Sequence, residues 1–207
     1  MSFPREPRIH SIPIKELCPT QITVGMREVA EKRERWREHD KKKKAEFLGS
    51  HLIPVVMGPR GKYYVLDHHH LARALFDEKV AEVAITVVAD LSRLERNSFW
   101  VYMDNRNWMH LYDADGVRRN HTDLPKHVGG LVDDPYRSLA GELRRAGGFA
   151  KETTLFNEFL WADFLRRRIK PRTIEATPEE ALAAAIGLAK SEDANYLPGW
   201  CGPFTMA

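Results

Sequence analysis

Short apolar runs alternate with longer, mostly charged stretches over about the first 90 residues of the chain. Apolar runs of four to eight residues between turn residues are typical of strands, whereas scattered apolar positions in a charged stretch are typical of a surface helix. Gly49-Ser50 ends the longest such stretch, which Thr23 would cap. The expected elements are a strand at 12–14, a helix at 24–48, strands at 52–57 and 62–66 joined by a turn at 58–61, a helix at 68–76 and a strand at 83–89.

Beyond residue 90 the pattern becomes helical. Helices are expected at 91–103, 135–146, 153–169 and 177–190. Gly147-Gly148 ends the second of these, and Thr177-Pro178-Glu179-Glu180 begins the last with an N-cap, a proline at N1 and a glutamate at N3. The sequence therefore predicts an α/β (α+β) domain with a small mixed sheet at residues 8–90, and a helical C-terminal extension packed on it at 91–207.

Composition indicates the class of protein and the cellular compartment in which it works. Hydrophobic residues make up 43% of the 207 residues, which is enough for a packed core. No apolar run approaches the roughly 20 residues that cross a bilayer, and the first residues lack a signal peptide. Cys18 and Cys201 do not form a disulfide framework. We expect a cytoplasmic protein with no membrane partner.

The charge balance bears on nucleic acids. The chain has 32 basic and 29 acidic residues, a net charge of +3, and dedicated DNA-binding proteins usually carry a stronger and more clustered basic excess. Lys41-Lys42-Lys43-Lys44 is the densest basic run, but acidic residues lie among its neighbours, and a solvated helix face also explains it. DNA is therefore a possible partner, with weak and strongly salt-dependent binding.

The segment that carries candidate chemistry is Asp67-His68-His69-His70, where an apolar strand is expected to end and a helix to begin. The first N–H groups of a helix lack intrahelical partners, and the helix dipole makes that end attractive to phosphate. Imidazoles at such a place can donate hydrogen bonds or relay protons, and Asp67 could orient a histidine or bind Mg²⁺ together with a nucleotide. The alternative is that Asp67 caps the helix and the histidines lie half-buried beside it.

Three parts of the chain together resemble a known family. Tyr64 to Ala74 resembles the nucleotide-phosphate motif of the ParB/sulfiredoxin superfamily, and Pro19-Thr20-Gln21 resembles the Pro-x-(Glu/Gln) element that follows the first strand in its members. The segments 134–140, 147–149 and 158–164 resemble the C-terminal part of the "putative ParB-like nuclease" family. The resemblance covers about residues 8 to 170.

The resemblance implies a site for a nucleotide (ATP, ADP or CTP) with Mg²⁺, or for a phosphorylated small molecule. Phosphoryl transfer or phosphodiester hydrolysis would then be the reaction, and a non-catalytic protein that associates with DNA or binds a ligand is the alternative. The residues implied are Asp67, His69 and His70 as catalytic groups, Asp67 as the metal ligand, and Gln21, His68 and Arg73 as groups that line the same cleft.

This sequence departs from the family motif at several positions. His68 stands where relatives have glycine, and Leu71 stands where they carry a phosphate-binding arginine, for which Arg73 could partly compensate. Gln21 occupies the place of the catalytic glutamate of the free-serine kinases, and an amide cannot act as a base. His69 replaces the sulfiredoxin cysteine, which excludes that reaction here.

Overall fold

The computed structural model describes residues 9–203 and divides the chain into two compact units. The predicted first domain residue, Arg8, and the last four residues of the predicted extension lie outside the described residues. Unit 1 takes the chain up to Thr23, Val29–Asp113 and Val117–Val132, and unit 2 takes Val24–Glu28, Ala114–Gly116 and the residues from Asp133 onward.

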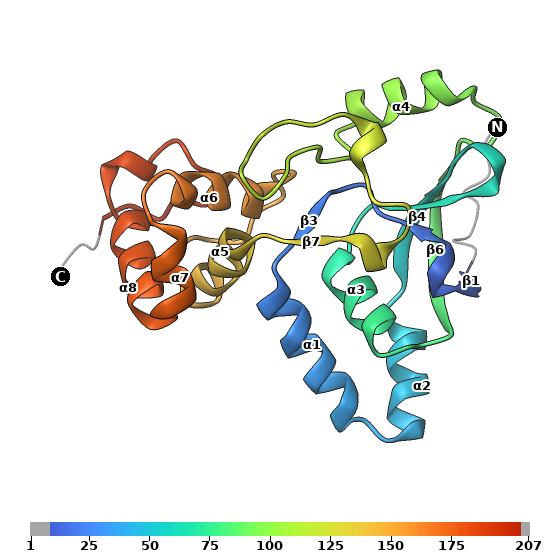
Figure 1. Ribbon diagram of the computed structural model, residues 1–207, viewed down its shortest axis with the longest axis horizontal. Helices are drawn as coiled ribbons and strands as arrows, with labels where there is room; N and C mark the ends of the chain where they lie inside the picture. Colours follow the sequence, from blue (N-terminus) through green and yellow to red (C-terminus); the bar gives the residue numbers. More distant parts are fainter. Residues whose placement is uncertain (1–8, 204–207) are drawn as a thin grey trace. The chain divides into compact units, whose positions relative to one another are not determined.

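Unit 1 is built on a mixed sheet of five strands in the order β1-β6-β4-β5-β2 (Figure 1). β6 pairs antiparallel with β1 and parallel with β4, while β5 pairs antiparallel with β4 and parallel with β2. The predicted α/β class with a small mixed sheet is therefore confirmed. The strands are β1 (Ile9–Pro13), β2 (Leu17–Cys18), β4 (Ile53–Met57), β5 (Tyr63–Val65) and β6 (Glu82–Asp90).

The predicted hairpin is present as β4 and β5, and β4 contains a proline, Pro54. A proline within a strand is compatible with an edge strand or with the start of a strand. β4 lies between β6 and β5, so it is not an edge strand. Pro54 is its second residue, and its carbonyl accepts a hydrogen bond from Leu66 N at 2.9 Å.

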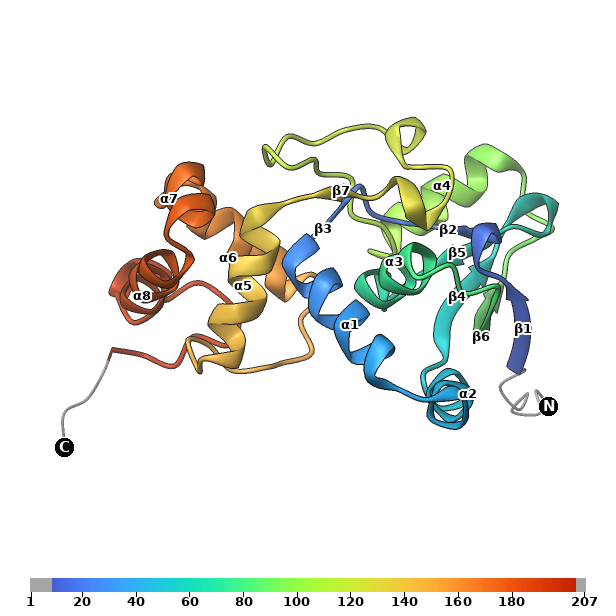
Figure 2. The ribbon, with the colours of Figure 1, turned by 60° about the horizontal axis from the view of Figure 1, so that its bottom comes forward.

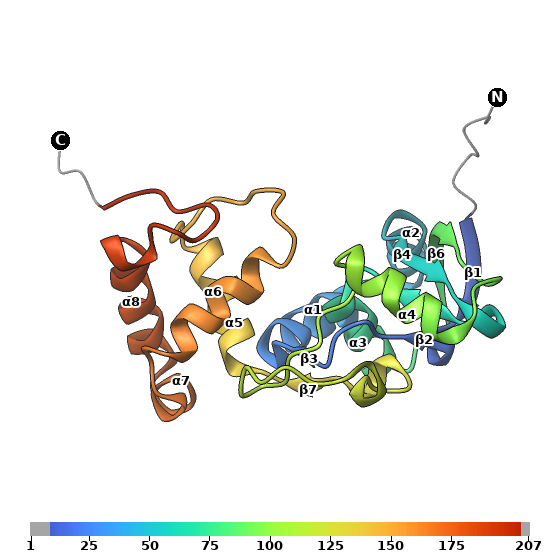
Figure 3. The same ribbon diagram turned by 90° about the horizontal axis from the view of Figure 1, so that it is seen from above.

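The helices of unit 1 correct one prediction. The single helix expected at 24–48 is wrong, because the chain forms α1 (Met26–Glu38) and then α2 (Lys41–Ser50). Asp40 is extended between them, and its carboxylate accepts from Lys43 N at 2.9 Å, so it caps a new helix. α3 (His69–Asp77) and α4 (Arg96–Asn105) complete the α-helices of unit 1 (Figure 3). Phe99 and Met103 of α4 share a buried cluster with Val56.

Unit 2 contains three of the helices predicted beyond residue 90 (Figure 2), whereas the one expected at 91–103 is present as α4 in unit 1. The core of unit 2 is rich in aromatic and small residues, with Phe149 stacked on Trp161 at 4.5 Å between ring centroids. The predicted helix at 153–169 is shorter in the structure, because Phe156 takes the left-handed conformation (φ 59°) just before it begins. The helices are α5 (Pro135–Arg145), α6 (Asn157–Arg166), α7 (Pro171–Ala176), which was not predicted, and α8 (Pro178–Ala189).

Two short strands, β3 (Thr23–Val24) and β7 (Val132–Asp133), form a second, two-stranded sheet that was not predicted. Val132 N donates to the carbonyl of Ile22 within unit 1. Unit 1 thus continues past residue 90, where the sequence suggested a boundary, and the division into domains at 8–90 and 91–207 stays a prediction. Within residues 9–203, every helix is too short or too polar to span a membrane.

Candidate functional site

The turn between β5 and α3 contains the four residues that the sequence singled out. Asp67 and His68 are exposed, and Asp67 Oδ1 accepts a hydrogen bond from His68 N at 2.6 Å. His68 takes the left-handed conformation, with φ 67° and ψ 26°. A side chain in that conformation costs about 1–3 kcal/mol, whereas glycine adopts it freely. The backbone therefore has a conformation suited to the glycine of the family motif, although histidine is present.

The amino terminus of α3 begins directly at this turn. The side chain of His68 forms no capping hydrogen bond with any described residue, and Ala72 N donates to the carbonyl of His68 at 2.8 Å as the first turn closes. An uncapped helix start concentrates partial positive charge on outward-pointing N–H groups. Such a start can receive an anion.

His69 points into the protein and is not exposed at the surface of the turn. It is 5% exposed, and its Nε2 accepts a hydrogen bond from Thr20 N at 3.2 Å. The hydroxyl of Thr20 lies 3.3 Å from the same nitrogen and donates to the carbonyl of Val65 at 2.5 Å. Because a backbone N–H can only donate, Nε2 is the acceptor and the ring proton sits on Nδ1. His69 therefore joins the start of α3 to the Thr20 segment.

The Thr20-Gln21 segment is held from a second side by His110. His110 N donates to the carbonyl of Thr20 at 2.8 Å, and Gln21 pairs with His110 in an isolated parallel bridge. The Gln21 side chain is buried and donates to the carbonyl of Thr23 at 2.7 Å. Sequence reasoning missed Thr20 and His110. Thr20 was within the Pro-Thr-Gln element, but no signal in the sequence pointed to His110.

The remaining predicted residues of α3 have different surroundings. His70 is half-buried and Leu71 is buried. Arg73 pairs with Asp77 at 3.0 Å on its own helix, and its guanidinium also donates to the carbonyl of Leu131. The turn thus presents Asp67, His68 and part of His70 to solvent, while Arg73 is engaged in holding neighbouring protein groups.

Metal ligands do not gather in this region. Across residues 9–203, no three His, Cys, Asp or Glu side chains are placed to hold a metal ion together. Mg²⁺ in proteins often uses only one or two carboxylates, with phosphate oxygens and water completing its shell. The exposed carboxylate of Asp67 fits that pattern.

The comparisons with known proteins agree with this architecture. Residues 10–167 match the family model described as "Putative ParB-like nuclease". The chain belongs to this ParB-like family. It is also similar to the crystal structure of protein Atu1540 from Agrobacterium tumefaciens, with 50% sequence identity, a TM-score of 0.91 and coverage of 97% of this chain and 100% of that one. A search of curated proteins found no match.

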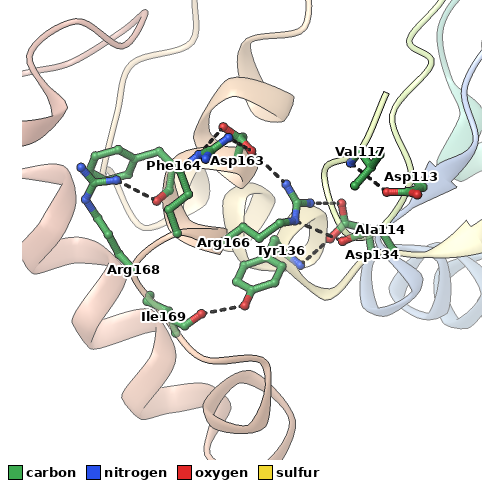
Figure 4. A network of polar contacts seen from close by, with 11 residues as sticks. Asp113, Ala114, Val117, Asp134, Tyr136, Asp163, Phe164, Arg166, Arg168 and Ile169 are labelled. Carbon is green, nitrogen blue, oxygen red and sulfur yellow. Dashed lines mark hydrogen bonds and ion pairs between the residues drawn. The ribbon is translucent and has the colours of Figure 1, made fainter. Parts of the chain in front are cut away.

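This ParB-like protein has a second polar cluster, within unit 2, around the buried carboxylate of Asp134 (Figure 4). Asp134 is 2% exposed, and its Oδ1 accepts from Tyr136 N at 3.0 Å, which caps α5. Its Oδ2 lies 2.6 Å from Arg166 Nη2, and Arg166 Nε donates to the carbonyl of Ala114 at 3.1 Å. Burial raises the pKa of Asp134, and the charge of Arg166 opposes that rise.

The cluster also ties the end of α6 to α5. The hydroxyl of Tyr136 donates to the carbonyl of Ile169 at 2.6 Å, and burial raises the pKa of this phenol. Arg166 Cζ lies 5.1 Å from the centroid of the Tyr136 ring. The aspartate and tyrosine of the C-terminal family segment at 134–140 therefore hold the helices of unit 2 together.

Proposed function

We propose that this ParB-like protein binds the phosphate of a small molecule, with a nucleotide as the leading class, at the start of α3. One observation carries the proposal: the helix begins uncapped at the surface, directly after a left-handed residue. Strained backbone conformations persist at functional turns because they aim backbone and side chains at a ligand. Phosphate is one of the anions that such helix starts bind.

The side chains of the turn suit a phosphate that carries Mg²⁺. Asp67 would hold the metal through its exposed carboxylate, and bound Mg²⁺ would neutralise phosphate charge. His70, half-buried in the first turn, would donate to a phosphate oxygen or relay a proton in phosphoryl transfer or phosphodiester hydrolysis. His69 would hold the Thr20-Gln21 segment in place and would not contact the phosphate, since its Nε2 already accepts a hydrogen bond from Thr20 N.

Calorimetric titration tests the proposal. Wild type is titrated with ATP, ADP and CTP, each with and without Mg²⁺, beside His70→Gln, Asp67→Asn and the control His121→Gln. We expect His70→Gln to weaken binding about tenfold, as the loss of a charge-assisted hydrogen bond would. Asp67→Asn should remove the dependence on Mg²⁺, and the control should bind as wild type does. The proposal fails if wild type binds no nucleotide and no inorganic phosphate.

A second candidate function is weak binding of nucleic acid by α2. Lys41, Lys42 and Lys43 are exposed in the first turn of this helix, where the dipole disfavours cations. Arg33 and Arg37, by contrast, both donate to Glu78, and Lys42 forms only an exposed ion pair of 3.9 Å with Glu46. Lysines in an unfavourable position suggest a polyanionic partner.

The apolar residues of α2 favour nucleic acid over a membrane surface. Phe47 stacks on His51 at 3.9 Å between ring centroids and also packs on Trp36, so it does not face solvent with the lysines. A helix that lies on a membrane needs an exposed apolar face. Binding through phosphate groups would also depend on salt, and each lysine removed from a phosphate should reduce the slope of log K against log salt by about 0.9.

The test is fluorescence anisotropy with a labelled duplex at several salt concentrations. A variant with glutamine at 41–43 should lose most binding and most of the salt dependence. The matched control replaces Lys62, Lys126 and Lys170 with glutamine, and the candidate fails if both triple variants lose equally.

A further inference from the structure

Arg137 is the most deeply buried arginine described in unit 2. It is 4% exposed, and its Cζ lies 3.5 Å from the centroid of the Phe159 ring. The hydrogen-bonding capacity of its Nε and Nη1 is not met by any described residue. Burial lowers the pKa of Arg137, while nearby carboxylates oppose the effect. A buried charge with unused donors is costly unless something satisfies it.

Glu158 and Asp134, two carboxylates that act on Arg137, are each engaged more closely by another arginine. Glu158 Oε1 lies 2.7 Å from Arg144 Nε, whereas its other oxygen is 3.7 Å from Arg137 Nη2. Asp134 lies 2.6 Å from Arg166. Glu142 is similarly paired with Arg27 at 2.9 Å. Arg137 therefore has no carboxylate within hydrogen-bond distance among these partners.

The first turn of α6 lies beside Arg137 and adds to the electrostatic attraction of an anion. Glu158 and Phe159, which both lie against Arg137, belong to the first turn of this ten-residue helix. Phe156 precedes it in the left-handed conformation and provides no side-chain cap to the described residues. The partial positive charge at the start of the helix and the charge of the guanidinium therefore attract an anion to the same position.

We propose that Arg137 binds one anionic group, a phosphate or a carboxylate of a small molecule, at the first turn of α6. Oxygens of that group would accept from Nε and Nη1, while Phe159 covers one face of the guanidinium. Arginine donates from several directions in one plane, which suits both kinds of oxyanion. Residues 151–155, which lie just before the start of α6, form neither helix nor strand and are exposed. This site lies within unit 2 and is independent of the turn at α3.

Glu158 gives the sharpest test, because its carboxylate competes with the ligand. Wild type, Glu158→Gln, Arg137→Lys and the control Glu142→Gln are titrated calorimetrically with inorganic phosphate and with acetate, against sodium chloride of equal ionic strength. We expect wild type to bind at least one of the two oxyanions, and Glu158→Gln to bind it about tenfold more tightly, since like charges side by side cost more than 1 kcal/mol. Glu142→Gln should match wild type, and comparison of phosphate with acetate identifies the preferred group.

Arg137→Lys and one additional double variant keep the outcome decisive. Arg137→Lys should bind at least tenfold more weakly, and if it fails to fold, Glu158→Gln alone decides. The double variant Glu158→Gln/Arg144→Gln should keep the gain, because Arg144 is not the binding group. The proposal is overturned if neither oxyanion binds wild type or Glu158→Gln beyond the chloride control, or if the double variant loses the gain. His70→Gln should leave this binding unchanged, which separates the two sites.

Discussion

Of the helices that begin close after an aspartate, α3 and α5 have that aspartate in opposite surroundings. Asp67 precedes the start of α3 and is exposed, and its carboxylate accepts a hydrogen bond from the adjacent His68 N. Asp134 precedes α5 and is 2% exposed, with one oxygen capping the helix and the other paired with Arg166. The same residue type thus marks an open helix start in unit 1 and a closed one in unit 2.

The difference distinguishes polar contacts that stabilise the fold from polar groups that a ligand could bind. Around Asp134 the carboxylate is satisfied by Tyr136 N and Arg166, so the energy of these contacts goes into holding helices together. At α3 the helix start is uncapped and His68 is held in an unfavourable conformation without a compensating side-chain cap. Unused polar capacity together with strain is what a ligand can exploit. Substitutions at the two helix starts test this contrast.

The largest expected effect separates the two aspartates by stability. Asp134→Ala removes a cap and leaves Arg166 without its closest partner, which should cost about 3 kcal/mol, the lower end for a broken buried ion pair. The figure is at the lower end because Asp163 lies 3.5 Å from Arg166 and can partly replace it. Asp67→Ala should cost about 0.5–1 kcal/mol, as for one exposed hydrogen bond. Urea denaturation of the two variants measures both, and equal losses would remove the contrast.

Substitutions of the two histidines of α3 should also differ in their effect on stability. His69→Ala opens a buried space and leaves Thr20 N without its acceptor, which should cost about 1–3 kcal/mol. His70→Ala, at a half-buried position, should cost about 0.5 kcal/mol. Both are measured by thermal and urea denaturation, with ligand binding measured separately. If His70→Ala proves more destabilising than His69→Ala, the assignment of His69 as the inward-facing residue is wrong.

This contrast was only partly visible in the sequence. Alternation and turn residues predicted β4, β5, α3 and β6, because local patterns set those elements. The start of α8 was predicted from Thr177-Pro178, with Pro178 in its first turn, but the Thr177 hydroxyl donates to the carbonyl of Thr173 and does not cap the helix. The break between α1 and α2 was missed, since Asp40 lies in a charged run where capping aspartates and surface aspartates look alike.

The candidate site was predictable in position but not in orientation. Adjacent residues of a helix point about 100° apart, so at least one of three consecutive histidines had to face the protein. Which one depends on Thr20, 49 residues away, and no local pattern reports that contact. The buried state of Arg137 was hidden for the same reason, because Phe159 and Glu158 reach it from another helix.

A smaller effect concerns the backbone at the open helix start. His68→Gly should stabilise the protein by up to about 1 kcal/mol, because glycine adopts φ 67° without steric cost. His68→Ala should not stabilise it, since the strain comes from Cβ. At the closed start, Asp134 has φ −128°, an ordinary extended value, so Asp134→Gly should only destabilise. Urea denaturation of the three variants checks the set, and a loss of stability in His68→Gly would show that the imidazole contributes more than the strain removes.

The smallest effect is a pH dependence that belongs to the closed helix start. Burial raises the folded-state pKa of Asp134 above its ordinary value of 3.8, so the native state holds the proton more tightly than the unfolded chain does. The stability from this group is fully present below the ordinary pKa and is lost as pH rises through the folded pKa. Asp134→Asn can still cap α5 but cannot ionise. The stability of wild type relative to Asp134→Asn should therefore fall as pH rises above about 4, by about 1.4 kcal/mol for each unit of pKa shift. Urea denaturation of both proteins from acid to neutral pH measures this difference. If wild type instead gains on Asp134→Asn as pH rises, attraction to Arg166 outweighs burial, and the closed helix start is a net stabilising ion pair.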